Sequence, residues 1–115
     1  MNLYHTDLGL PKGFALPDTR VPLMWTEHAK KARTSDRYGV IPMVETLPLA
    51  SFSVIEVAMT GKRVEKVVVR GSFTKDLDAV FVLIPGEVWK VKTVWINKKN
   101  DTHKTLDRSK YVVIG

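Results

Sequence analysis

The sequence predicts an α+β fold in which one helix packs on an antiparallel sheet of four to five strands. Two changes of pattern along the chain support this prediction: a helical period over Leu23–Tyr38, and a strand-like period after Ala50. The 115 residues, of which 44% are hydrophobic, suffice for a single core. We therefore expect residues 1–22 to form an extended arm and residues 23–115 to form one domain.

The first segment, residues 1–22, contains Pro11, Pro17 and Pro22, whose spacing excludes a long helix. In the predicted helix, small and aromatic residues recur at helical spacing (Trp25, Ala29 and Ala32), and Gly39 follows as a candidate C-cap. Pro42 and Pro48 then bracket a linker that is too short for a second long helix.

The remaining segments have the composition of strands and are separated by turn residues such as Gly61-Lys62 and Pro85-Gly86. The expected strands are Phe52–Thr60, Arg63–Arg70, Asp78–Ile84, Val88–Asn97 and Tyr111–Ile114. Asp78–Ile84 is apolar on both faces and is expected at the centre of the sheet. Strict alternation in Val88–Asn97 puts Trp89, Val91, Thr93, Trp95 and Asn97 on one face, with the two tryptophans expected in the core.

Composition limits the classes of function. Eighteen Lys and Arg against twelve Asp and Glu give a net charge of +6, which favours polyanionic partners, with RNA foremost. The absence of cysteine excludes disulfides and thiolate chemistry. The sequence has no early basic cluster followed by a signal-length apolar run, and no run of eighteen apolar residues. We therefore expect a cytoplasmic protein with no membrane partner.

The late segment from Val91 to Tyr111, VKTVWINKKNDTHKTLDRSKY, is unusually rich in groups that handle protons and phosphates. A solvated turn needs Asn and Asp for its backbone geometry, but it has no need of a histidine, several cations, hydroxyls and a tyrosine close together. This surplus makes the segment the first place to look for a functional site.

This segment and the earlier TEHAKKARTSDRYG together resemble small phage and bacterial proteins of the RelE-like branch of the barnase, colicin and RelE ribonuclease superfamily. The resemblance covers roughly residues 25–111. It implies a helix packed on a four-stranded antiparallel sheet, with a toxin-type site on the open sheet face that cleaves RNA without a metal. An antitoxin or a host protein is the further partner that it implies.

Cleavage of RNA by its own 2′-hydroxyl needs a base, an acid and cations for the phosphorane charge. Histidine suits the first two roles, and Arg suits the third through its bidentate fork. The catalytic candidates are therefore His28, His103 and Arg37, and the substrate-binding candidates are Arg33, Asn97, Thr105 and Tyr111. Each also has a structural interpretation: a half-buried or solvated histidine, an exposed cation, a turn or strand residue, or a half-buried sheet tyrosine.

The three histidines are far apart in sequence and form no HExxH motif, so we expect neither a metal site nor a cofactor. A different class of function stays open: a noncatalytic basic protein that binds a host protein or nucleic acid, or a virion accessory protein. Catalysis predicts that His28, His103 and a cation converge on one phosphate, whereas wide separation favours binding.

Overall fold

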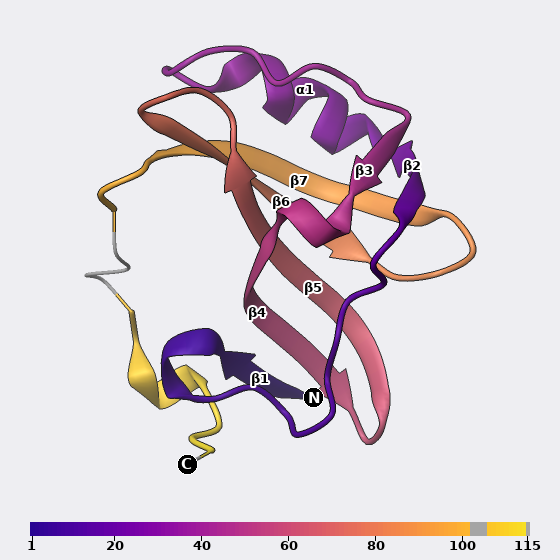
Figure 1. The fold of residues 1–115 in the computed structure, drawn as a ribbon, viewed down its shortest axis with the longest axis vertical. Helices are drawn as coiled ribbons and strands as arrows, with labels where there is room; N and C mark the ends of the chain where they lie inside the picture. Colours follow the sequence, from indigo (N-terminus) through magenta and orange to yellow (C-terminus); the bar gives the residue numbers. More distant parts are fainter. Residues whose placement is uncertain (102–105, 115) are drawn as a thin grey trace.

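The computed structural model describes residues 1–101 and 106–114 and contains a seven-stranded mixed sheet with one α-helix (Figure 1). The strands are β1 (Asn2–His5), β2 (Arg20–Trp25), β3 (Thr46–Pro48), β4 (Ser53–Thr60), β5 (Arg63–Ser72), β6 (Leu77–Ile84) and β7 (Trp89–Lys98). Their order in the sheet is β1-β4-β5-β6-β7-β2-β3. All neighbours pair antiparallel except β2 and β7, which are parallel.

The predicted fold class, one helix on a four- to five-stranded antiparallel sheet, is therefore wrong. The additional strands lie in segments that were expected to form the arm, the helix and the linker. β1 lies within residues 1–22, β2 begins there and ends in the expected helix, and β3 lies in the linker that Pro48 bounds. The apolar residues at the start of the expected helix, Leu23 and Trp25, pair instead with Trp89 and Val91 of β7. A run this short satisfies either period, and the tertiary pairing decides between them.

The four strands expected between residues 52 and 97 are confirmed within one or two residues at each end, and β6 is the central strand as predicted. The expected last strand, Tyr111–Ile114, is wrong. These residues follow a short 3-10 helix, Arg108–Lys110, and the amides of Val112 and Ile114 donate to the carbonyls of Leu3 and Leu8. The C-terminal segment thus lies along the N-terminal strand without joining the sheet.

Helix α1 (Glu27–Ser35) begins after Thr26, whose hydroxyl oxygen accepts a hydrogen bond from the amide of Ala29 as an N-cap. It ends before Asp36, whose carboxylate accepts hydrogen bonds from the amides of Tyr38 and of Ile96 in β7. The helix therefore runs beside the part of β7 that β2 leaves unpaired, as Figure 1 shows. Covering this edge satisfies backbone groups that would otherwise offer a site for strand pairing.

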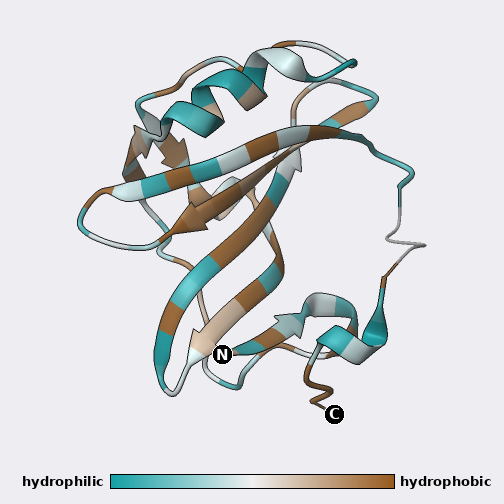
Figure 2. Cartoon of the chain, turned by 180° about the vertical axis from the view of Figure 1, so that it is seen from behind, coloured by the Kyte–Doolittle hydropathy of each residue, from teal (hydrophilic) through white to brown (hydrophobic). Residues whose placement is uncertain are grey.

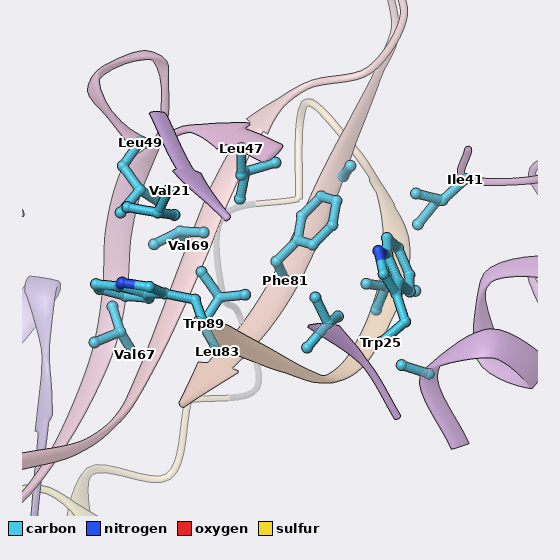
Figure 3. Packing of buried hydrophobic residues seen from close by; sticks show 14 of the residues in the cluster. Val21, Trp25, Ile41, Leu47, Leu49, Val67, Val69, Phe81, Leu83 and Trp89 are labelled. Carbon is cyan, nitrogen blue, oxygen red and sulfur yellow. The ribbon is translucent and has the colours of Figure 1, made fainter. Parts of the chain in front are cut away.

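The main core lies between the sheet, α1 and the segments that follow the helix (Figure 3). Val67 and Val69 of β5, Phe81 and Leu83 of β6 and Trp89 of β7 meet there. Val21 of β2 and Leu47 of β3 pack in the same cluster, so the sheet curls its β2-β3 edge over the core. Figure 2 shows hydrophilic residues interrupting the hydrophobic ones along most strands, and the second side of the sheet carries polar residues such as Glu56, Arg70 and Thr93. We call this second side the open face.

A β-bulge in β7 changes which of its residues face the core. The pairing with β6 shifts between Val82 and Leu83, which lie opposite Thr93 and Val91. An extra residue in one strand reverses the direction of every side chain beyond it. Trp89 and Val91 therefore point into the core before the bulge, and Val94 and Ile96 do so after it. The predicted common face for Trp89 through Asn97 is wrong, and Thr93, Trp95 and Asn97 belong to the open face.

The core contains one tight backbone approach that gives a testable prediction. A Cβ at Gly71 would lie 2.7 Å from the Phe52 ring, which packs edge-to-face on Phe81 at 5.8 Å. Gly71→Ala should lower the free energy of unfolding by about 1–3 kcal/mol because the aromatic pair must shift. Urea denaturation measures the change. The control, Ser53→Ala at an exposed position, should stay within about 0.5 kcal/mol, and an unchanged Gly71→Ala protein would contradict the packing.

Candidate functional site on the open face of the sheet

Strand register arranges the open face in lateral rows. One row runs from His5 in β1 through Glu56, Val68 and Val82 to Thr93 in β7. The next contains Ser53, Arg70, Val80 and Trp95, and a third contains Ser72, Asp78 and Asn97. Polar and charged side chains therefore surround a small apolar centre.

The apolar centre is a second cluster, separate from the main core. Val68, Val80 and Val82 are buried, and Ile55 and Trp95 pack against them while remaining partly exposed. The prediction that both tryptophans lie in the core thus holds for Trp89, which is 9% exposed, while Trp95 packs on the other side of the sheet. An aromatic ring in this position offers a surface on which a planar ligand can stack.

His28 lies at the β7 end of the first row. It is in the first turn of α1 and exposed, and its Nε2 lies 3.2 Å from Thr93 Oγ1. The N-cap residue Thr26 fixes this end of the helix to β7, because its hydroxyl donates to the carbonyl of Val91 at 3.0 Å. The helix thus places His28 at the edge of the open face, beside the row next to that of Trp95.

Arg70 forms a structural network at the third row. Its Nε donates to Asp78 at 2.8 Å, and its two terminal nitrogens donate to the carbonyls of Lys98 and Asp101. Lys99 donates to the other oxygen of Asp78 at 2.6 Å. All three guanidinium nitrogens are engaged, so Arg70 fixes the end of β7 and is a poor candidate for binding a phosphate.

Arg37 and Asn97 lie together in a hollow of about 550 Å³ between the end of α1 and the end of β7. The Arg37 guanidinium lies 4.8 Å from the centre of the Tyr38 ring, and the Lys98 ammonium lies 5.9 Å from it. Asp36 also lines the hollow, but its two oxygens accept backbone amides. Two cations beside one aromatic ring favour an anionic ligand here.

A carboxylate cluster occupies the β1 end of the face. Lys66 lies 2.9 Å from one oxygen of Glu56, and the hydroxyl of Tyr111 donates to the other at 2.7 Å. His5 is 4% exposed and contacts the Tyr111 ring edge-to-face at 5.2 Å. Its Nδ1 accepts the amide of Asp7 at 3.1 Å and lies 3.8 Å from the Asp7 carboxylate.

These contacts set the protonation states of the cluster. Burial raises the pKa of Glu56, but the hydrogen bonds from Lys66 and Tyr111 outweigh it and hold that pKa below the ordinary 4.5. Burial, together with the hydrogen bond to Glu56, raises the pKa of Tyr111 to about 12. Glu56 is therefore ionised at neutral pH, and Tyr111 is a hydrogen-bond donor that does not act as a base.

The C-terminal segment forms one wall of a pocket beside this cluster. Ile55, Val68 and Trp95 line the pocket of about 280 Å³ from the sheet, while Asp107, Lys110 and Tyr111 line it from the segment. The segment is fixed by the Tyr111 hydroxyl and by amide hydrogen bonds to β1 and to Leu8. A Cβ at Gly9, whose φ is +99°, would collide with the carbonyl of Ile114, so only glycine permits this approach.

The structure separates the predicted site residues into groups. His28 lies beside Thr93 in the middle of β7, whereas Arg37 and Asn97 lie in the hollow at the end of that strand, beyond the C-terminus of α1. Tyr111 lies over β4. Arg33 donates to the carbonyl of Ile41 at 3.2 Å. His103 and Thr105 fall outside the described residues.

Sequence reasoning missed the carboxylate cluster. His5 was assigned to the arm, whereas β1 places it opposite Glu56. The available signal was only the presence of Glu56 within β4 and Lys66 within β5, because strict alternation from the Thr60–Arg63 pair places them on opposite faces and the register shift between Ala58 and Met59 brings them together. The signal for His5 was weaker, because a four-residue strand gives little pattern.

In the described part of the chain, no group of three or more His, Cys, Asp or Glu is placed to hold a metal ion. No helix among those residues is long and apolar enough to cross a membrane. Comparisons with protein-family models, curated proteins and solved structures find no match. The residues of the open face are therefore the basis for any proposal about function, and the ribonuclease resemblance stays a prediction.

The Arg70 network predicts a specific dependence of stability on pH. Burial raises the pKa of Asp78, but hydrogen bonds from Lys99 and Arg70 bring it below the ordinary 3.8. Because the folded pKa is the lower one, this stabilisation is present above about pH 4 and is lost as pH falls through the folded value. Asp78→Asn should therefore destabilise the protein at pH 7 and much less at pH 2.5.

Urea denaturation at the two pH values measures this difference. The control is Asp18→Asn, at an exposed position, for which the difference from the parent should be small at both. A difference between Asp78→Asn and the parent that is equally large at pH 7 and pH 2.5 would contradict the network.

Proposed function

We propose that this protein binds single-stranded RNA across the open face of its sheet and cleaves it without a metal ion, by attack of a ribose 2′-hydroxyl. The observation that supports this most directly is that Thr93, Trp95 and Asn97 follow one another along the open face of β7, with His28 beside Thr93 and Arg37 beside Asn97. The net charge of +6 favours such a polyanion.

The geometry of β7 suits an extended strand of RNA. Alternate residues of a β-strand are about 6.6 Å apart, comparable to the spacing of nucleotides in an extended single strand. A base stacked on Trp95 would place its neighbouring ribose near His28 and the next phosphate toward Asn97 and Arg37. Aromatic stacking of this kind, flanked by cations, is how sequence-tolerant proteins bind single strands.

His28 is the described residue best placed for proton transfer. It is exposed, and its Nε2 contact with Thr93 orients the ring toward the open face. Imidazole can accept a proton from a 2′-hydroxyl or donate one to a leaving 5′-oxygen. In this proposal His103 supplies the complementary role, and Arg37 holds a phosphate. Tyr111 positions the C-terminal segment through Glu56.

The cleavage proposal is tested by incubating the protein with total RNA in EDTA and analysing the products for 2′,3′-cyclic phosphate ends. His28→Ala should reduce the cleavage rate about 10²-fold or more while leaving thermal unfolding unchanged, because it removes a proton carrier at an exposed position. Lys30→Ala is the matched control on the same helix, since Lys30 is an exposed cation that pairs with Glu27, and it should cleave like the parent.

Absence of cleavage by the parent protein, or equal cleavage by parent and His28→Ala, would overturn catalysis. A second function, noncatalytic binding of RNA or of a host protein, is favoured by the separation of His28, Arg37 and Tyr111 from one another. RNA binding that weakens steeply as the salt concentration rises would then support noncatalytic binding of RNA. If RNA does not bind even at low salt, noncatalytic binding of a host protein is the alternative that remains.

A further inference from the structure

The pocket between Trp95 and the C-terminal segment differs in chemistry from the rest of this basic surface. Its floor is apolar, formed by Ile55 and Val68, and one wall is the ring of Trp95. Its rim carries two carboxylates, Glu56 and Asp107. A phosphate inside the pocket would be repelled by these two carboxylates, so the pocket fits a different part of a nucleic acid from the cationic hollow beside Tyr38.

From this arrangement we infer that the pocket binds one unstacked nucleobase of the RNA and selects bases that carry an amino group, namely adenine, cytosine or guanine, over uracil. The inference deepens the proposed function and rests on it for the identity of the ligand. Splayed bases in single-stranded RNA are recognised by stacking on aromatic side chains and by hydrogen bonds to their edges.

Size and shape support a single base. The pocket of about 280 Å³ is at the small end of ligand pockets, which span roughly 300–1,000 Å³. It has room for one planar ring system and not for a folded peptide. Trp95 is a partly exposed tryptophan in the apolar cluster, whereas Trp25 and Trp89 are each 9% exposed and face the core. A base entering the pocket therefore meets one accessible indole.

The rim accounts for selectivity. An ionised carboxylate accepts hydrogen bonds and cannot donate them, and each of its oxygens has about two acceptor sites. Among the described residues, each Glu56 oxygen has one hydrogen-bonding partner, Lys66 or Tyr111, so acceptor capacity remains on both. Asp107 uses Oδ1 for the amide and hydroxyl of Ser109, and among the described residues its Oδ2 has no partner.

The amino groups of adenine, cytosine and guanine can donate hydrogen bonds to these two carboxylates, as cytosine N4 does to Asp or Glu in DNA recognition. Uracil presents a carbonyl oxygen at the corresponding position, which the carboxylates repel. Lys110, also on the rim, can take the adjoining phosphate because its charge is opposite. The basic surface thus attracts the backbone, and the acidic pocket discriminates among bases.

The test uses six-nucleotide 2′-O-methyl oligonucleotides, which lack the 2′-hydroxyl needed for cleavage, with a uracil run carrying one adenine, cytosine or guanine. Fluorescence anisotropy with the intact chain should show at least one substituted oligonucleotide binding about 10-fold more tightly than the all-uracil probe. Glu56→Gln should reduce this preference to less than about 3-fold without weakening the all-uracil probe, because the repulsion of the uracil carbonyl is relieved.

Glu65→Gln is the matched control, because Glu65 lies in β5 on the same strand pair, pairs with Arg63 and does not line the pocket. It should retain the full preference. Should Glu56→Gln fail to fold, Asp107→Asn at an exposed position tests the same rim, and quenching of Trp95 fluorescence by cytidine or adenosine monophosphate more than by uridine monophosphate tests the parent protein, with Trp95→Phe as the background.

The outcomes separate the two proposals. Equal binding of every oligonucleotide, or a base preference that both rim variants retain, overturns the base pocket and leaves RNA binding in place. Absence of binding by any oligonucleotide at low salt overturns RNA binding and the pocket together. Base preference without any RNA cleavage supports the pocket and contradicts catalysis alone.

Discussion

The β-bulge in β7 is the constraint on which the rest of the structure depends. In a regular strand, Thr93 and Asn97 would enter the core with Trp95, while Val94 and Ile96 would face solvent. The register shift opposite Val82 and Leu83 reverses this, so that both halves of β7 supply apolar residues to the core. The same shift turns Trp95 to the open face and lets α1 lie beside β7, where Asp36 accepts the amide of Ile96. The same bulge therefore determines both the packing of the core and the position of the candidate site.

The termini complete the open face by a different route. β1 extends the sheet beyond β4 and brings His5 opposite Glu56, and the C-terminal segment then lies over β1 through Tyr111 and Val112. Figure 1 shows β7 with α1 at one end of the molecule and β1 with the C-terminal segment at the other. Both ends of the face thus present polar groups, a histidine and cations beside β7 and a carboxylate cluster beside β4, with the valine and tryptophan cluster between them.

The sequence predicted the elements whose signals are local. Long Val-rich runs bounded by Gly61-Lys62 and Pro85-Gly86 located β4 to β7, and the doubly apolar β6 is central. The prediction from sequence failed for segments whose secondary structure depends on pairing with a distant strand. Leu23–Trp25 fits a helix or a strand, and only its contact with Trp89 and Val91 makes it a strand. β3 has three residues, too few for a period. The bulge breaks the assumption of strict alternation, and no residue near Thr93 marks it.

The candidate site shows the same division. His28, Asn97 and Arg37 were identified from residue types and do lie along β7, but the cluster of Glu56, Lys66 and His5 depends on long-range pairing.

The most direct test of the central claim is nuclear magnetic resonance titration with a noncleavable single-stranded RNA. The account predicts that the Trp95 indole signal and the amides of Thr93 and Asn97 shift, while the indoles of Trp25 and Trp89 stay in place. Shifts confined to the outer side of α1, or to residues of the main core, would contradict it.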